Sequence, residues 1–144
     1  MSLTGGYDRN NVFALIIRGE LPCHRVHEDR KFLAFMDRFP QSRGHLLVIP
    51  KLSDARNILE IDSDNLAGLF SMAQRLARAV NEALKPDGVQ ILQMNGTAAG
   101  QTVFHIHIHV VPRWAGVELG FHRAKEADDA ELGDLAKLIA THVR

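Results

Sequence analysis

Residues 104–111 read Phe-His-Ile-His-Ile-His-Val-Val, and this alternation of histidine with apolar residues predicts a β-strand. Side chains of a strand point to alternate faces, so we expect His105, His107 and His109 to share one face. Neighbouring imidazoles would then lie about 6.6 Å apart, since a strand rises about 3.3 Å per residue. The opposite face would pack on a core and fix the register. The residues expected on that apolar face are Phe104, Ile106, Ile108 and Val110.

The rest of the chain predicts a single α+β domain over residues 11–144, preceded by a flexible leader at residues 1–10. Residues 63–84 form the clearest helix, because apolar residues recur along one face and Asp62 or Ser63 can cap its start. A short helix at 12–18 and a C-terminal helix at 127–142 are also expected. An antiparallel sheet of about five strands should use residues 25–28, 32–36, 45–49, 89–95 and 102–112.

Composition limits the possible partners of this 144-residue chain. Its 17 basic and 17 acidic residues cancel, so nothing in its net charge favours nucleic-acid binding. One cysteine, Cys23, allows no intramolecular disulfide and fits a reducing compartment. The sequence has no secretory signal pattern and no apolar run long enough to span a membrane. We therefore expect a cytoplasmic protein without membrane or nucleic-acid partners.

Three imidazoles on one rigid element indicate a chemical site. Neutral imidazole is a good nucleophile near neutral pH, and phosphorus is a reasonable target for it. The loop Asn-Gly-Thr-Ala-Ala-Gly-Gln-Thr at 95–102 leads directly into the histidine run. Its glycines, Gly100 among them, let the backbone approach a ligand, while Gln101 and Thr102 add side-chain donors. A phosphate would fit between this loop and the histidines.

Two other interpretations of the histidine run are open. An exposed edge strand would give the alternation no function, but three imidazoles in register are improbable as decoration. A metal site is the stronger rival, because histidine is the commonest metal ligand. However, a row along one strand suits a closed tetrahedral cage poorly, and no acidic residue within the run completes a facial triad.

The motif His-Ile-His-Ile-His-Val-Val at 105–111 resembles the signature of the histidine triad superfamily. Residues 17–22 (Ile-Arg-Gly-Glu-Leu-Pro), 44–51 (Gly-His-Leu-Leu-Val-Ile-Pro-Lys) and 100–105 (Gly-Gln-Thr-Val-Phe-His) are also similar to family segments, in the family order. The resemblance covers most of residues 11–114. It is closest to the branch of nucleoside phosphoramidases and related small bacterial hydrolases.

The resemblance implies a role for each matching residue. His107 would attack the α-phosphate of a nucleotide conjugate, with His105 and His109 flanking it. His45 matches a fourth histidine of the family's site, and Asp37 matches the acid that holds the ribose hydroxyls. Phosphate and leaving-group contacts fall at Asn95, Gln101 and Thr102. The apolar slot for the base would consist of Val12, Phe13, Ile16, Phe35 and Leu47.

This chain departs from its relatives at two places. Many bacterial relatives carry a Cys-x-x-Cys pair that contributes to a structural zinc site, but here those positions are Asn11 and Ala14. A further histidine of that site is replaced near Ser53, so we expect no structural zinc. Arg38 stands where an apolar residue is usual, and it could change base preference or contact a phosphate.

The resemblance implies a homodimer that hydrolyses phosphoramidates or related conjugates of nucleoside 5′-phosphates through a nucleotidyl-histidine intermediate, with no metal or redox cofactor required. Three alternatives stay open: a dinucleoside polyphosphate hydrolase, a nucleotide-binding regulatory module with little activity, and an enzyme that uses the triad as metal ligands. Trp114 could cover a partner subunit's site or pack within its own subunit.

Overall fold

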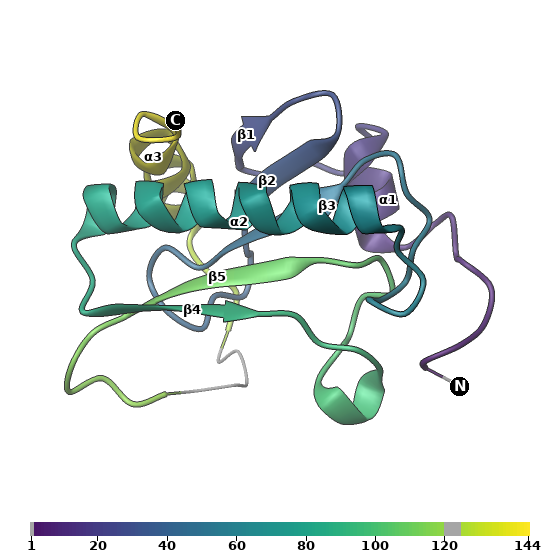
Figure 1. Ribbon diagram of the computed structural model, residues 1–144. Helices are drawn as coiled ribbons and strands as arrows, with labels where there is room; N and C mark the ends of the chain where they lie inside the picture. The colour runs from purple at the N-terminus through teal and green to yellow at the C-terminus, as the bar shows by residue number, and fades with distance from the viewer. Residues whose placement is uncertain (1, 120–124) are drawn as a thin grey trace.

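A five-stranded antiparallel sheet with strand order β1-β2-β3-β5-β4 forms the centre of the structure (Figure 1). The structure is a computed structural model that describes residues 2–119 and 125–144. This architecture confirms the predicted α+β class. The described strands are β1 (Arg25–Glu28), β2 (Phe32–Met36), β3 (Leu46–Pro50), β4 (Gly88–Leu92) and β5 (Ile108–Arg113). The described helices are α1 (Val12–Ile17), α2 (Ser63–Leu84), α3 (Asp129–Ala140) and the 3-10 turn η1 (Thr97–Ala99).

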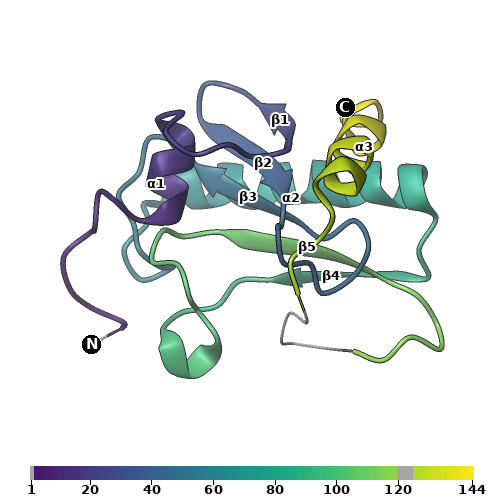
Figure 2. The same cartoon turned by 180° about the vertical axis from the view of Figure 1, so that it is seen from behind.

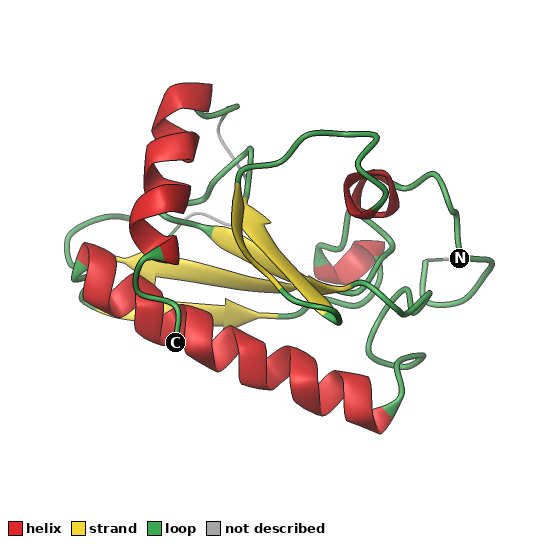
Figure 3. Ribbon diagram, turned by 90° about the horizontal axis from the view of Figure 1, so that it is seen from above, coloured by secondary structure: helices red, strands yellow, loops and turns green. Residues whose placement is uncertain are grey.

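The sheet separates two apolar clusters, because side chains alternate along its strands. Ala34 and Met36 of β2 join the larger cluster, which contains the apolar stripe of α2 and the inner face of α3. Leu33 and Phe35 of the same strand face the other way and join a smaller cluster with α1. The strands accordingly lie between α2 and α1 when viewed from above, and α1 is on the side seen from behind (Figures 2 and 3).

Local hydrogen bonds explain where several elements begin. The Asp62 side chain accepts from the backbone N–H of Asn65 and caps α2, as the sequence predicted. Asp29 accepts from the N–H groups of Lys31 and Phe32, which forms the expected turn between β1 and β2. Among the described residues, no helix has both the length and the apolar character needed to cross a membrane.

The histidine run differs from its prediction, because β5 begins at Ile108 and only His109 lies on the strand. The expectation of a strand from residue 102 is therefore wrong for residues 102–107. The pairing of β3 with β5 ends at the Val48–Ile108 pair. Two residues earlier in the chain, the N–H of Ile106 donates to the carbonyl of Ala55, in the loop after β3. Alternation nevertheless persists, since Ile106 and Ile108 are fully buried in the larger cluster.

Phe104 also departs from the predicted pattern. Its ring lies outside the larger cluster, and the Arg56 guanidinium lies 5.0 Å from its centroid. Phe104 lies before the start of β5, so strand geometry does not determine the direction of its side chain. Smaller boundary shifts occur at the other elements, such as the end of β4 at Leu92 instead of residue 95.

Gly44 fixes the entry of the chain into β3, directly before His45. Its φ angle is +91°, and a Cβ at this position would collide with the Leu84 side chain and lie 3.2 Å from Pro112. The position therefore requires glycine for two reasons, backbone conformation and close packing against the end of α2. Gly19 offers a comparison, because its φ is +78° while nothing lies within 4 Å of its added Cβ.

We predict that Gly44→Ala destabilises the protein more than Gly19→Ala does. Both substitutions impose a left-handed backbone on alanine, at roughly 1–2 kcal/mol. Only Gly44→Ala adds a steric clash, with Leu84 and Pro112, which costs up to roughly 1–3 kcal/mol more, depending on how far the half-buried Leu84 side chain can move. Denaturant unfolding of both variants measures the difference, and equal losses of stability would contradict the close contact with Leu84.

Candidate active site

A cavity of about 410 Å³ opens on the α1 side of the sheet and brings together most of the residues predicted to form the site. Its apolar wall comes from α1, β2 and β3, and its polar end contains two of the triad histidines. The predicted residues that line it are Val12, Phe13, Ile16, Phe35, Asp37, Leu47, Thr102, His107 and His109.

His107 is held by its neighbour in the triad and by α1. Its Nδ1 lies 2.7 Å from the carbonyl oxygen of His105, and a carbonyl can only accept, so the proton is on Nδ1. Phe13 packs edge-on against the ring, with the centroids 4.9 Å apart. Burial lowers the pKa of His107 to about 3, and the neighbouring His109 contributes in the same direction. His107 is therefore neutral near pH 7, with its lone pair on Nε2.

His105 lies behind the cavity wall rather than in it. Its Nε2 lies 2.8 Å from the Pro50 carbonyl oxygen, which requires the proton on Nε2. Nδ1 therefore carries a lone pair, and the Tyr7 hydroxyl donates to it over 2.6 Å. Burial lowers the pKa of His105, although the bond to Pro50 opposes this shift. No pattern in the sequence indicated the contact with Tyr7.

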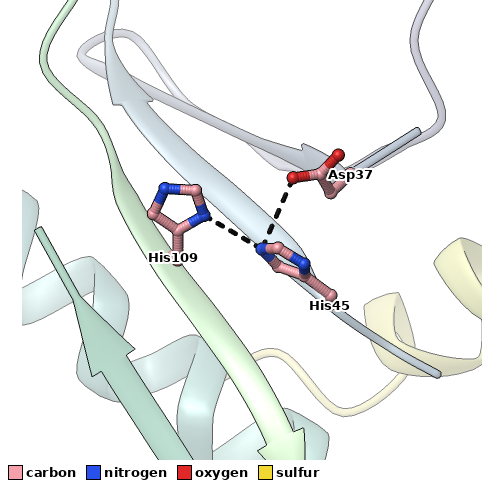
Figure 4. A group of neighbouring side chains, drawn as sticks. All are labelled: Asp37, His45 and His109. Atoms are coloured by element: carbon pink, nitrogen blue, oxygen red, sulfur yellow. Dashed lines mark hydrogen bonds and ion pairs between the residues drawn. The ribbon is translucent and has the colours of Figure 1, made fainter. Parts of the chain in front are cut away.

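His45, His109 and Asp37 form a second group at the polar end of the cavity (Figure 4). The backbone N–H of Gln41 donates to His45 Nδ1 over 3.0 Å, so the His45 proton must be on Nε2. Nε2–H lies 3.0 Å from His109 Nδ1 and 3.4 Å from Asp37 Oδ2. His109 consequently carries its own proton on Nε2, which has no hydrogen-bond partner among the described residues.

The unpartnered Nε2–H of His109 is a buried donor, and buried donors are costly unless a ligand or water satisfies them. Burial lowers the pKa of His109 to about 4, and His45 adds to the shift. Burial also lowers the pKa of His45 to about 3, with Arg113 and His107 contributing. All four site histidines are therefore neutral in the folded protein near pH 7, each with a defined tautomer.

The ligand atoms of Asp37, His45 and His109 all lie within 4.8 Å of one another, as a metal site would require. However, a metal ion needs a lone pair on each histidine nitrogen that it binds. His45 Nε2 carries a proton as long as Nδ1 accepts from the Gln41 backbone. The hydrogen bonding of this group therefore favours a chain of proton donors over a metal centre.

The loop before the triad contributes differently from its prediction. Gln101 is buried, accepts from the N–H of Gly96, and donates to the carbonyls of Arg56 and Val103. The Asn95 side chain accepts from the N–H of Ile58 and exchanges hydrogen bonds with Gln93. These two side chains and Gly100 lie outside the cavity lining, whereas Thr102 lies in it. Their contacts with phosphate stay predictions.

The positions that the resemblance associates with zinc ligands hold residues with other contacts. Asn11 caps α1 by accepting from the N–H of Ala14 and donates to the Asp8 carbonyl. Ala14 has no ligand atom in its side chain, and Ser53 accepts from the N–H of Ala55. This donor set does not fit a structural zinc ion, which prefers thiolate and imidazole ligands. The prediction that the protein needs no zinc stays a prediction.

Several residues of the cavity were not predicted from the sequence. Cys23 and His24 lie in its lining, although the sequence suggested no role for them, and Leu132 reaches it from α3. Arg38 also lines the cavity and pairs with Glu126 over 3.0 Å, which connects the residue at 126 to the cavity wall. Trp114 is half-buried just after β5, and its contact with a partner subunit stays a prediction.

The arrangement of four histidines beside an apolar cavity can be compared with known proteins. Residues 18–116 match the HIT domain family, whose name abbreviates histidine triad. This chain belongs to that family. Members of it bind nucleotides and are generally nucleotide hydrolases.

Three similar proteins illustrate the family. A Hit-like protein of Bartonella henselae, described as involved in cell-cycle regulation and solved with an unknown ligand, is 42% identical with a TM-score of 0.88, covering 95% of this chain and 99% of its own. A hypothetical histidine triad nucleotide-binding protein of Sulfolobus tokodaii is 38% identical with a TM-score of 0.83, covering 91% and 90%. An adenylylsulfatase of Arabidopsis thaliana is 37% identical over 138 residues, 92% of this chain and 68% of the relative.

We predict that the free energy of unfolding falls as the pH is lowered from 7 to 5. In this range the unfolded chain protonates its histidines near the ordinary pKa of about 6.5, while the folded cluster, with pKa values of about 3 to 4, does not. Each such histidine contributes a slope of at most about 1.4 kcal/mol per pH unit. Denaturant unfolding at several pH values measures it.

The variant His107→Asn isolates one member of the cluster in this measurement. Removing one titrating group should make the slope between pH 7 and 5 shallower by up to about 1.4 kcal/mol per pH unit, whatever the variant does to stability at pH 7. Identical slopes for the two proteins would show that His107 is not held neutral by the fold.

Proposed function

We propose that this protein hydrolyses conjugates of nucleoside 5′-phosphates, phosphoramidates or related compounds, through a nucleotidyl intermediate on His107. The observation that carries this proposal is the bond from His107 Nδ1 to the His105 carbonyl. It commits the ring proton to the protein and leaves the lone pair on Nε2 of a residue that lines the cavity. A nucleophilic histidine needs this tautomer.

In the first step, His107 Nε2 attacks the α-phosphorus, and the bond to the leaving group breaks with its electron pair. Sulfate or phosphate leaves as an anion, whereas an amine leaves neutral after its nitrogen takes a proton from solvent, which the hydrolysis step later returns. The resulting nucleotidyl-imidazolium keeps its proton on Nδ1 and continues to donate it to the His105 carbonyl oxygen. Water then attacks the same phosphorus and releases a proton, and the P–N electron pair returns to Nε2.

His109 is suited to stabilise the charge that develops on the phosphate. Its ring lies 4.9 Å from that of His107, and its buried Nε2–H has no partner among the described residues. A fixed donor in a site with little water stabilises a developing anion more than a mobile water does. His45 holds the required tautomer of His109 by donating to its Nδ1.

The remaining walls of the cavity suit a nucleoside. Apolar side chains from α1, β2 and β3 form a slot for a base, and Asp37 lies at its polar end. One oxygen of Asp37 accepts from the N–H of Phe39, which fixes the carboxylate beside the cavity. The name of the similar Arabidopsis adenylylsulfatase supports an adenylyl conjugate as one substrate of this class.

Two alternative functions would use the same site. A dinucleoside polyphosphate hydrolase would use the same nucleophile, and turnover of an adenosine phosphoramidate against diadenosine polyphosphates separates the two. A regulatory nucleotide-binding module would bind nucleoside monophosphates without turning over any conjugate.

We also propose a homodimer in the cytoplasm. Strand β4 lies at the edge of the sheet, and Ile91 on it and Phe70 on the adjacent α2 are each about 40% exposed. An edge strand beside exposed apolar side chains favours pairing with a second copy. The single cysteine and balanced charge support a reducing compartment and no nucleic-acid partner.

We predict that His107→Ala lowers turnover of an adenosine phosphoramidate by at least about 10³-fold, as expected when a nucleophile is removed. Binding of AMP, followed by calorimetry, should change only a few-fold, because the base slot and Asp37 are intact. Phe104→Leu is a suitable control, since Phe104 precedes the triad but contacts Arg56 outside the cavity. Turnover of His107→Ala near that of wild type would exclude His107 as the nucleophile.

A second variant tests the ribose contact. Asp37→Asn should weaken binding of AMP about tenfold, the loss expected for one charge-assisted hydrogen bond, and leave binding of 2′,3′-dideoxy-AMP within about twofold. The ratio of the two affinities separates loss of the ribose contact from any general disturbance through His45. An equal loss for both nucleotides would reject the ribose assignment.

A further inference from the structure

The segment that carries His105 and His107 lacks the support of a sheet. Because β5 begins at Ile108, residues 102–107 form no ladder of hydrogen bonds with β3. A single backbone bond, from Ile106 to Ala55, ties this part of the chain to its neighbour among the bonds described. The position of the His105 carbonyl, which sets the His107 tautomer, must therefore depend on side-chain contacts as well.

The His105 side chain supplies two such contacts. Its Nε2–H donates to Pro50 at the end of β3, and its Nδ1 accepts from the Tyr7 hydroxyl. The ring is thus held from both sides, between the sheet and the N-terminal segment. Burial raises the pKa of Tyr7, so the hydroxyl keeps the proton that it donates.

We propose that Tyr7 is a positioning residue of this site: its hydroxyl fixes the ring of His105, and His105 in turn fixes the proton of the nucleophile His107. The inference rests on the proposed function. Tyr7 does not line the 410 Å³ cavity, so it acts through His105 and not on the substrate. Three hydrogen bonds of 2.6 to 2.8 Å meet at His105: its ring bonds to Tyr7 and Pro50, and its backbone carbonyl accepts from His107.

The N-terminal segment is attached on both sides of Tyr7. Before it, Ser2 Oγ accepts from the N–H of Thr97, and the Leu3 carbonyl accepts from Asn57. After it, Arg9 pairs with Asp54 over 2.8 Å. These contacts hold Tyr7 next to His105. The sequence predicted a flexible leader here and did not suggest this role.

The positions that the resemblance associates with zinc ligands lie close to Tyr7 and His105. Tyr7, Ala14, Ser53 and His105 line one small cavity of about 150 Å³, and the Asn11 side chain lies close enough to Tyr7 to lower its pKa. Positions 11 and 14, and the region near Ser53, are those that the resemblance associates with zinc ligands. The lone pair of His105 Nδ1 accepts from the Tyr7 hydroxyl here, so a hydrogen bond restrains this ring nitrogen.

Imidazole nitrogen NMR tests the proposal without requiring turnover. Long-range ¹H–¹⁵N spectra of the full-length protein distinguish a protonated ring nitrogen from one with a lone pair, so they report the tautomers of His105 and His107 directly. Tyr7→Phe keeps the aromatic ring and removes only the hydroxyl. Ser2→Ala is the matched control, because it loosens the same segment without touching His105.

We expect wild type and Ser2→Ala to show His107 protonated on Nδ1 alone. Tyr7→Phe should shift both ring nitrogens of His107 towards the average of two exchanging tautomers and should change the Nδ1 signal of His105. Wild-type signals for both histidines in a folded Tyr7→Phe, or the same changes in Ser2→Ala, would overturn the proposal. These outcomes are readable even if the protein turns over no phosphoramidate.

Kinetics gives a second readout that a purely structural role would not produce. Tyr7→Phe should lower kcat for an adenosine phosphoramidate about tenfold, the lower end of the loss seen when outer-shell partners are removed. KM and AMP affinity should stay within about twofold, because Tyr7 lies outside the binding cavity. An unchanged kcat, or a loss carried by KM alone, would contradict the positioning role.

Discussion

The hydrogen bond from His107 Nδ1 to the carbonyl of His105 is the interaction on which the rest of the site depends. It decides which ring nitrogen has a lone pair, and a carbonyl cannot reverse that choice by donating. The same logic extends around the cluster, since Pro50 fixes the proton of His105 and the Gln41 backbone fixes that of His45. Backbone groups thus define the tautomers of three histidines directly, and that of His109 through the His45 side chain, while burial keeps all four neutral.

The fold serves this pattern by packing both faces of a thin sheet. On one face, α2 and α3 bury the isoleucines that alternate with the triad. On the other, α1 places Phe13 edge-on against His107 and leaves an apolar cavity beside it. The cost of burying polar imidazoles is offset by internal hydrogen bonds at nearly every ring nitrogen. The clearest exception among the described residues is His109 Nε2, a buried donor without a hydrogen-bond partner.

The sequence predicted the fold class through its regular patterns, and most of the residues around the cavity through local resemblance. Periodicity located α2 at residues 63–84, and alternation placed Ile106 and Ile108 in the core. The local resemblance pointed to Asp37 and to the apolar residues that line the cavity, whose contacts with ribose and base stay predictions. What it could not predict depends on contacts between distant parts of the chain: the end of β5 pairing at Ile108, the hydroxyl of Tyr7 on His105, and the approach of Leu132 from α3. No periodicity records such contacts.

Covalent catalysis by His107 is the central claim, and trapping the intermediate tests it most directly. The protein would be mixed rapidly with an adenosine 5′-phosphoramidate, quenched within milliseconds to seconds, digested, and mapped by mass spectrometry. An adenylyl group on the peptide that carries His107, attached to that ring and absent from His107→Ala, is the predicted result. An adenylyl group on another residue, or turnover that inverts the configuration at a chiral phosphorus as a single direct displacement by water does, would contradict it.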